Sequence, residues 1–260
     1  MAKNNKRRGT VDRRDEILRT LREKGKVKVD ELSEVFDVSS VTIRNDLEFL
    51  EQKGIIYRIY GGALLREVVS HDTELDEKQK LHPEEKKRIG QASADLVLDG
   101  ESIILDSGTT TLQIAKHIKE KQNLTVMTNA INIAFELAGI NEITMMLTGG
   151  MIRKKSYSLV GPEAEASIQS YYFDKFFLGV DGFDLRYALT TPNPMEAQLN
   201  RLMVERSNEV IAVTDSSKFG RRSFSYICAL EDIDCVITDA DIPQSYQDEL
   251  TKMNIRVITV

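Results

Sequence analysis

The sequence has few of the residues that build metal centres and covalent cross-links. Two cysteines and three histidines occur among its 260 residues. Cys228 and Cys235 show neither the CxxC spacing of many metal sites nor a histidine close by. We therefore expect buried free thiols, and the sequence predicts no metal site, no disulfide framework and no cofactor.

Long apolar runs are also missing. No stretch approaches the roughly 18 to 20 apolar residues that span a bilayer. The first residues, MAKNNKRRGT, lack the apolar core of a signal peptide. These two absences predict a cytoplasmic protein with no membrane partner.

Neither charge dominates the chain as a whole, but the two signs are unevenly distributed. Residues 1–66 carry 15 Lys and Arg against 11 Asp and Glu, whereas the remaining residues carry 20 against 30. A basic head on an acidic body fits a phosphate-binding module joined to a second domain. A balance this small also arises by chance, so charge alone does not decide the function.

The head of the chain shows the pattern of three short helices. Apolar positions predict helices over residues 12–24 and 30–36 and, after a cap at Ser39 or Ser40, a third helix that ends near Gly54. Two short helices joined by a few residues form the helix-turn-helix pattern. The alternative is a three-helix bundle whose outer face is only solvated.

The third predicted helix carries residues suited to DNA on the face opposite its apolar stripe. Arginine can bind guanine or phosphate, asparagine can read adenine, and hydroxyl groups reach phosphates. The predicted DNA-binding residues of this helix are Ser39, Ser40, Val41, Thr42, Arg44, Asn45 and Glu48.

A β-hairpin is predicted directly after this helix. Residues 55–60 are rich in β-formers, Gly61 and Gly62 indicate a turn, and residues 63–65 can return as a second strand. Such a hairpin is a wing. Arg58 and Tyr60 are expected to touch the DNA backbone or minor groove, although Tyr60 could equally pack against the third helix.

The stretch TIRNDLEFLEQKGIIYRIYGGALL resembles the DNA-binding signature of the DeoR family of transcription regulators. Its central residues run from Thr42 to Leu47. Within it, Asp46 falls towards the buried side of the helix and is interpreted as a structural partner for a nearby basic residue. The resemblance implies a winged helix-turn-helix that binds double-stranded operator DNA.

The sequence predicts three segments. Residues 1–66 form the DNA-binding domain, residues 67–82 are a charged linker without apolar periodicity, and residues 83–260 form a larger domain.

In this larger domain strand and helix signals alternate, which predicts an α/β fold with a mainly parallel sheet covered by helices on both faces. Strands are expected at 102–105, 124–127, 144–147, 175–180, 210–213, 235–238 and 256–260. Helices are expected at 83–98, 111–119, 131–138, 163–169, 195–206 and 243–252.

Ligands of such folds bind beyond the carboxyl ends of the strands. The first strand leads into Asp106, Ser107, Gly108, Thr109 and Thr110, a turn whose N–H and hydroxyl groups suit an oxyanion. It lacks the Gly-Lys pair of a P-loop, and the alternative is a capped turn without a ligand.

Further polar strand ends point to a pocket for a sugar phosphate, with cations for the phosphate and carboxylates for the sugar hydroxyls. These additional candidates are Thr128, Asn129, Gly149, Gly150, Arg153, Lys154, Asp181 and Lys218.

The motifs ILDSGTTT, MTNAINIA, MLTGGMIRKKSYSLVGPEAE, FDKFFLGVDGFD and VTDSSKFGR resemble the DeoR-type effector domain, a fold similar to ribose-5-phosphate isomerase. The resemblance implies that residues 107–110 hold the phosphate. It also implies that Arg153 lies at the rim or contacts the effector. The residues implied at the sugar end are Asp106, Asp181, Glu196 and Lys218.

One departure concerns the family pattern Thr-x-Asn-x-x-Glu-Ala. Here it runs from Thr191 to Ala197, with Pro192 and Pro194 on both sides of Asn193, another candidate effector contact. The two prolines stiffen this loop, so the effector preference of relatives should not be carried over.

Together these features predict a repressor of a carbohydrate-utilisation operon, for instance one for an amino sugar, that acts as a homodimer or homotetramer. A phosphorylated sugar would release it from DNA, or in the weaker variant activate it. The competing function is a sugar-phosphate isomerase or deaminase, but Gly182 stands where such enzymes tend to carry a second acid. A non-specific nucleoid-type DNA binder would not need the pocket.

Overall fold

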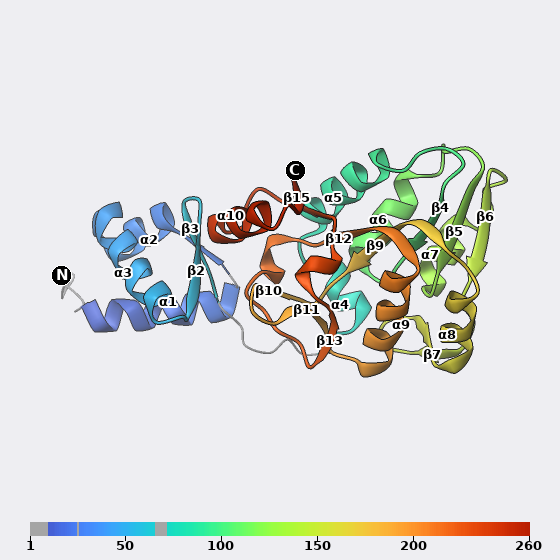
Figure 1. The fold of residues 1–260 in the computed structure, drawn as a ribbon. Helices are drawn as coiled ribbons and strands as arrows, with labels where there is room; N and C mark the ends of the chain where they lie inside the picture. Colours follow the sequence, from blue (N-terminus) through green and yellow to red (C-terminus); the bar gives the residue numbers. More distant parts are fainter. Residues whose placement is uncertain (1–9, 25, 66–71) are drawn as a thin grey trace. The chain divides into compact units, whose positions relative to one another are not determined.

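The computed structural model describes residues 10–24, 26–65 and 72–260 (Figure 1). The chain divides into two compact units, Met1–Glu67 and Val68–Val260. They are called the DNA-binding unit and the sensing unit below, and each is described by itself.

The DNA-binding unit contains three helices and a small antiparallel sheet. The helices are α1 (Thr10–Lys24), α2 (Val29–Phe36) and α3 (Ser40–Gln52), and the strands are β1 (Lys26–Lys28), β2 (Ile56–Ile59) and β3 (Gly62–Leu65). The sheet order is β1-β3-β2. The predicted helices and the β2–β3 hairpin are therefore present, whereas β1 was not predicted.

The apolar stripes of the three helices meet in one core. Ile17, Leu21, Ile43 and Leu47 are at most 1% exposed. The third strand closes over this core because Gly62 has no side chain: a Cβ at that position would lie 2.1 Å from the Val27 carbonyl oxygen.

The sensing unit is built on a seven-stranded sheet in the order β15-β14-β12-β9-β4-β5-β6, with all neighbours parallel. These are the seven strands that the sequence predicts. Their bounds are β4 Ser102–Leu105, β5 Leu124–Thr128, β6 Ile143–Leu147, β9 Phe173–Gly179, β12 Ser207–Val213, β14 Cys235–Thr238 and β15 Arg256–Thr259.

Helices cover both faces of this sheet, as predicted (Figure 1). The helices α5, α6 and α7 pack on one face, and α8 and α9 lie on the other. The bounds are α5 Pro83–Asp95, α6 Thr109–His117, α7 Ile131–Leu137, α8 Pro162–Gln169, α9 Pro194–Glu205 and α10 Gln244–Lys252.

Several short elements of the sensing unit were not predicted. A hairpin joins β7 (Met151–Arg153) to β8 (Ser158–Val160). A second antiparallel sheet has the order β10 (Gly182–Asp184), β11 (Ala188–Thr191), β13 (Ser225–Cys228). Two 3-10 turns, η1 (Ser216–Lys218) and η2 (Leu230–Asp232), complete the fold.

The predicted linker, residues 67–82, is more than a connector. Residues 67–71 lie outside the described residues, but residues 72–82 contain a short helix, α4 (Leu75–Lys80), that belongs to the sensing unit. Its one buried residue is Leu75, which explains why no apolar periodicity revealed it.

Within the described residues, no helix has the length and apolarity needed to cross a membrane. The same residues hold no group of three or more histidine, cysteine or acidic side chains placed to bind a metal ion. Cys228 and Cys235 are buried free cysteines.

Candidate functional site

The exposed face of α3 carries the predicted DNA-binding side chains. Ser39 caps the helix, since its Oγ accepts a hydrogen bond of 3.2 Å from the Thr42 backbone N–H. Arg44 and Asn45 are exposed, as is Glu48 one turn further on, whereas Ser40 and Thr42 are half-buried. The face therefore offers charged and amide groups while the apolar stripe of α3 is buried.

The hairpin after α3 presents two more predicted residues to solvent. Arg58 is exposed, and its backbone N–H donates to the Glu51 carboxylate at 3.1 Å, which ties β2 to α3. Tyr60 is 99% exposed, so the alternative that it packs against α3 is wrong.

Asp46 has the structural role that its position in the sequence predicts. It is 1% exposed, and its two oxygens pair with Arg13 Nε at 2.6 Å and Arg14 Nε at 2.7 Å. Arg14 also lies over the ring of Phe49. Both ion pairs join α1 to α3 and so fix the orientation of the helix that carries the exposed face.

In the sensing unit, the strand register brings the predicted strand ends together. Leu105 lies opposite both Phe177 and Thr128, so β4 and β5 end at one level and β9 continues two residues further, to Gly179. Asp106 follows β4 directly, and its carboxylate accepts from the Ser107 N–H at 2.6 Å. The helix α6 then begins at Thr109, after Gly108, without a side-chain cap.

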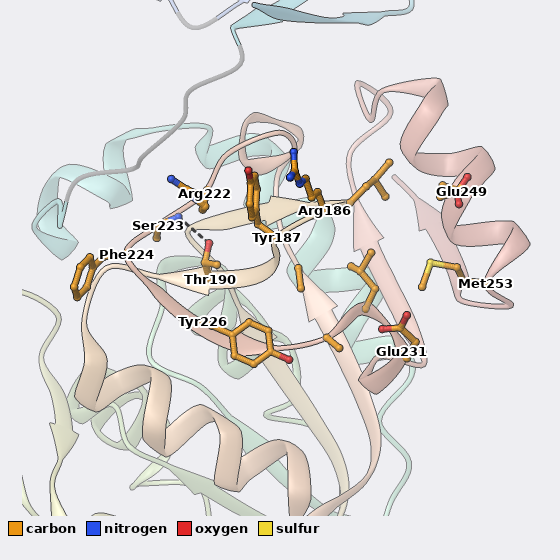
Figure 2. A pocket seen from close by; sticks show the side chains of 14 residues that line it. Arg186, Tyr187, Thr190, Arg222, Ser223, Phe224, Tyr226, Glu231, Glu249 and Met253 are labelled. Atoms are coloured by element: carbon orange, nitrogen blue, oxygen red, sulfur yellow. Dashed lines mark hydrogen bonds between the residues drawn. The ribbon is translucent and has the colours of Figure 1, made fainter. Parts of the chain in front are cut away.

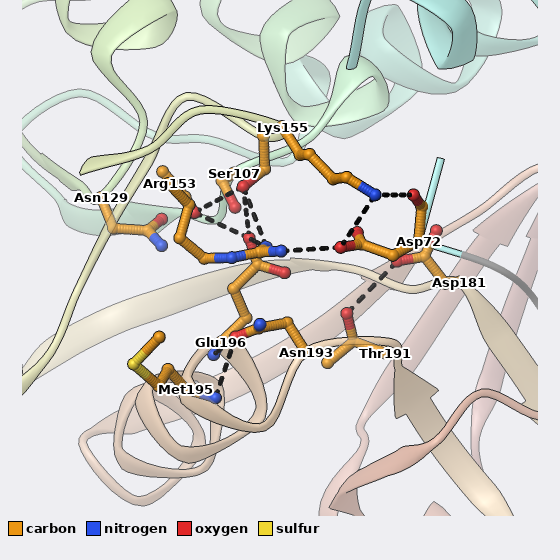
Figure 3. A network of polar contacts seen from close by, with 12 residues as sticks. Asp72, Ser107, Asn129, Arg153, Lys155, Asp181, Thr191, Asn193, Met195 and Glu196 are labelled. Carbon is orange, nitrogen blue, oxygen red and sulfur yellow. Dashed lines mark hydrogen bonds and ion pairs between the residues drawn. The ribbon is translucent and has the colours of Figure 1, made fainter. Parts of the chain in front are cut away.

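A network of ion pairs is centred on Arg153 (Figure 3). Its guanidinium pairs with Glu196 at 2.6 Å and with Asp72 at 2.9 Å. The same Glu196 oxygen accepts from Ser156 Oγ at 2.6 Å and Ser158 Oγ at 2.7 Å. Three donors on one carboxylate oxygen hold Glu196, and through it Arg153, in a fixed position.

A second ion pair lies at the end of β9. Lys78 Nζ is 2.5 Å from Asp181 Oδ1, and Thr191 Oγ1 donates to the other oxygen at 3.2 Å. Burial opposes ionisation of Asp181, but the charges of Lys78 and Lys218 outweigh it and lower the pKa of Asp181.

A third group surrounds η1. Burial opposes the charge of Asp215 as well, but Lys218 and the hydroxyl of Ser217 lower the pKa of this carboxyl. Burial lowers the pKa of Lys86 to about 8. Because Lys218 acts on both Asp181 and Asp215, these side chains form one electrostatically connected cluster.

Asp106 differs from the other acids of this cluster. Burial raises its pKa well above the usual value, and the nearby charges of Glu196 and Asp181 act in the same direction. Asn200 Nδ2 donates to it at 3.3 Å. Among the described residues, the buried Oδ1 atoms of Asn129 and Asn200 have no hydrogen-bond partner, so the site contains polar groups that remain available to a ligand.

Some predicted residues have local structural partners. Asn193 Oδ1 accepts from the backbone N–H groups of Met195 and Glu196 and caps α9, and Pro194 occupies the first turn, where proline is favoured. Thr128 Oγ1 donates to the Leu105 carbonyl oxygen. Their contacts with an effector remain predictions.

Three of the predicted effector-binding residues lie at the edge of the cluster. Gly149 and Gly150 lie in the connection between β6 and β7, and Lys154 is exposed after β7, outside the ion-pair network. The fold also brings four polar residues to the cluster that were not predicted from the sequence: Asp72, Lys78, Lys86 and Asn200. Asn200 could have been suspected, since it follows Glu196 by one helical turn.

A separate open pocket of about 1010 Å³ lies beside the second sheet (Figure 2). Tyr187 lies beneath the guanidinium groups of Arg186 and Arg222, and Phe224 is 79% exposed. None of the predicted effector-binding residues line this pocket, so the polar cluster and the pocket are distinct features.

Comparisons with known proteins agree with both units. The DeoR-like helix-turn-helix domain matches residues 13–68, and the DeoR C-terminal sensor domain matches residues 81–240. A putative aga operon transcriptional repressor of Escherichia coli O157:H7 is 42% identical over 97% of this chain and 94% of its own length. The regulator GolR of Listeria innocua is 36% identical over 89% and 91%, respectively.

Among solved structures, a D-ribose-5-phosphate isomerase aligns with 53% of this chain and 54% of its own, at 15% identity and a TM-score of 0.40. This distant similarity carries no conclusion about activity. The two domain matches and the full-length relatives, in contrast, show the family: the chain belongs to the DeoR family of DNA-binding transcription regulators.

Proposed function

We propose that the protein represses a carbohydrate-utilisation operon and that a phosphorylated sugar bound in the sensing unit controls its binding to operator DNA. The observation that carries the proposal is the cluster of acids and bases at the ends of β4, β9 and β12. Cations suit a phosphate, and buried carboxylates and amide oxygens suit sugar hydroxyls.

On the DNA side, Arg44 and Asn45 are the proposed base-reading residues, supported by their exposure on α3. The remaining predicted residues of α3 and the wing would position the helix through phosphate contacts. Two half-sites of an operator require two copies of this helix, so the proposal includes a homodimer or a homotetramer.

The proposed coupling is a population shift. An effector that binds more tightly to a DNA-incompetent arrangement draws the protein into it, and the operator is released. Coupling of this kind typically changes affinity by about 5- to 150-fold. The reverse sign, activation by the ligand, would require tighter ligand binding to the DNA-competent arrangement.

Sugar-phosphate isomerisation is the competing function, and the residue after Asp181 weighs against it. A second acid at this place would need a side chain on Gly182. A Cβ there would lie 2.5 Å from Thr190 Oγ1 and 2.7 Å from the Arg221 carbonyl oxygen. The backbone would have to move to admit one, so we expect binding without turnover.

The test is a DNA-binding titration on the region upstream of the gene and its neighbours, repeated with a panel of hexosamine and ketose phosphates. We expect specific binding that one of these compounds weakens by about 5- to 150-fold. Absence of specific binding would overturn the repressor, and turnover of a compound at an enzyme-like rate would favour the isomerase.

A further inference from the structure

The first described residues that follow the DNA-binding unit in the chain are held on the sensing unit mainly by charge. Asp72 contacts Arg153 and Lys155, and Lys78 contacts Asp181. The backbone N–H of Leu75 donates to the Lys155 carbonyl oxygen at 2.8 Å. The segment Asp72–Lys80 is called the tether below.

Little apolar burial supports the tether. Its helix, α4, has six residues and buries the side chain of Leu75 alone. A helix of this length is not stable by itself in water. The position of the tether therefore depends on its ion pairs and on Lys86 Nζ, which donates to the Lys78 and Leu81 carbonyl oxygens, both at 2.6 Å. An added anion can disturb the ion pairs.

The two carboxylates on Arg153 are held unequally. The Glu196 side chain is 10% exposed and accepts from two serine hydroxyls as well as from the guanidinium. The Asp72 side chain is 33% exposed, and its further charged neighbour, Lys155, is 3.8 Å away. Asp72 is thus the partner that can be exchanged without disturbing the position of Arg153.

The group that Asp72 occupies is suited to phosphate. Glu196 keeps Arg153 Nη1, and Nη2, the donor that Asp72 uses, can bind a phosphate oxygen as it binds a carboxylate. A phosphate ester carries a charge of about −1.5 to −2 near neutral pH and three acceptor oxygens, whereas the Asp72 carboxylate carries a single charge. A phosphate that reaches Arg153 and Lys155 therefore competes well with Asp72.

We propose that Asp72 is an internal competitor for the phosphate group of the effector: it pairs with Arg153 and Lys155, and a phosphomonoester that binds there displaces it and loosens the tether, which Lys78 continues to hold on Asp181. This inference rests on the proposed function, because it assumes that the polar cluster binds a phosphorylated ligand, and it places the phosphate on Arg153 and Lys155 in place of residues 107–110. Residues 1–67 are joined in sequence to the sensing unit through this tether, so displacement of Asp72 changes how the DNA-binding unit is attached.

The experiment uses the full-length protein and inorganic phosphate as the probe, with ionic strength held constant by chloride. Asp72→Asn removes the charge and keeps the size of the side chain. Asp76→Asn is the matched control, because Asp76 is an exposed acid in the same tether. Amide hydrogen exchange of residues 73–81 reports loosening of the tether, and a phosphorus NMR titration reports phosphate affinity.

We expect phosphate to speed exchange at residues 73–81 of the wild-type protein. In Asp72→Asn the exchange should be about tenfold faster without phosphate, the lower end of the effect of losing a charged hydrogen bond. Phosphate should also bind this variant about tenfold more tightly. The fold-change in amide exchange and the fold-change in phosphate affinity should agree, because both measure the same equilibrium between bound and displaced Asp72.

Three outcomes would overturn the proposal: phosphate that slows or does not change exchange of the tether, weaker phosphate binding to Asp72→Asn, or equal behaviour of Asp72→Asn and Asp76→Asn.

The same measurements distinguish failure of the proposed function from failure of this proposal. If no sugar phosphate releases the operator but phosphate still loosens the tether, the repressor mechanism fails alone. If sugar phosphate releases the operator and Asp72→Asn resembles its control, the internal competitor fails alone.

Discussion

Both units of the molecule bury carboxylates, and Asp46 and Asp106 are held in opposite ways. Asp46 in the DNA-binding unit is 1% exposed and pairs with two arginines at 2.6 and 2.7 Å. Asp106 in the sensing unit is 3% exposed, and its described hydrogen-bond partners, Ser107 and Asn200, are neutral. Burial and neighbouring acids raise the pKa of Asp106.

The difference reflects where each unit carries its candidate site. The DNA-binding unit exposes its polar face to solvent, so its interior can be fully paired and serve stability. The sensing unit encloses its polar groups, and a buried acid without a cation costs stability unless a ligand uses it. In the DNA-binding unit, a substitution should therefore change either DNA affinity or stability. In the sensing unit, one substitution should change both effector affinity and stability.

The largest effect is expected from Asp46→Ala. The substitution leaves Arg13, which is 8% exposed, without its counter-ion. Breaking a buried pair costs about 3 to 5 kcal/mol, and we expect about 3 kcal/mol because Arg14 remains partly solvated. Calorimetry of the full chain should show a lower melting temperature for the DNA-binding unit and an unchanged one for the sensing unit.

The matched control is Glu34→Ala, an exposed acid on α2, which should change stability by less than about 0.5 kcal/mol. If Asp46→Ala melts like this control, then the two arginine contacts do not stabilise the unit and the contrast with Asp106 fails.

The next largest effect is a loss of DNA affinity without a loss of stability. Arg44→Ala removes an exposed guanidinium from α3, so operator affinity should fall by about 1 to 3 kcal/mol while the melting temperature stays constant. Fluorescence anisotropy with operator and unrelated DNA checks this. Arg88→Ala, an exposed arginine of α5, controls for the loss of one positive charge.

A uniform loss of affinity on both DNAs would contradict base recognition by Arg44. It would show instead that this residue contacts phosphate, and the salt dependence of binding should then become shallower.

In the sensing unit, replacing the buried acid Asp106 should raise stability, whereas replacing Asp46 lowers it. Asp106→Asn removes an ionisable group from a buried site and can keep both hydrogen bonds, because Asn200 can turn its unpartnered Oδ1 towards the new amide. We expect a gain on the order of 1 kcal/mol, as for other functional-site residues that cost stability, together with weaker effector binding.

The pH dependence tests the cause of this gain. The pKa of Asp106 is raised in the folded protein, so the folded state binds the proton more tightly than the unfolded state. Wild-type stability therefore falls as the pH rises from the unfolded pKa, about 3.9, towards the folded pKa. The stability advantage of Asp106→Asn over the wild-type protein should grow from acid to neutral pH, and Asp76→Asn, at an exposed position, is the control variant. An advantage that grows towards acid pH would contradict this account.

The sequence predicted regular elements better than the contacts between them. All seven parallel strands were predicted because each contains a compact apolar run, and six of them are followed by polar or glycine residues, a purely local signal. The β7–β8 hairpin and the β10-β11-β13 sheet were missed, since their strands have three or four residues and no distinct periodicity.

The candidate site shows the same limit. Asp106, Asp181 and Lys218 could be predicted because they lie within five residues of the ends of β4, β9 and β12, at one edge of the sheet. Asp72 and Lys78 could not, because they lie in a charged stretch whose role depends on long-range pairing with Arg153 and Asp181. Local patterns carry no information about such partners.

The smallest effect is expected at the wing and completes the comparison. Tyr60 is 99% exposed, so Tyr60→Ala should leave the melting temperature unchanged. A single exposed contact in an interface is generally worth less than about 1 kcal/mol, or about fivefold in affinity. Anisotropy should show a loss within this limit on operator and unrelated DNA alike, since a contact with the DNA backbone carries no sequence information. A loss confined to the operator and as large as that of Arg44→Ala would instead place part of the sequence recognition in the wing.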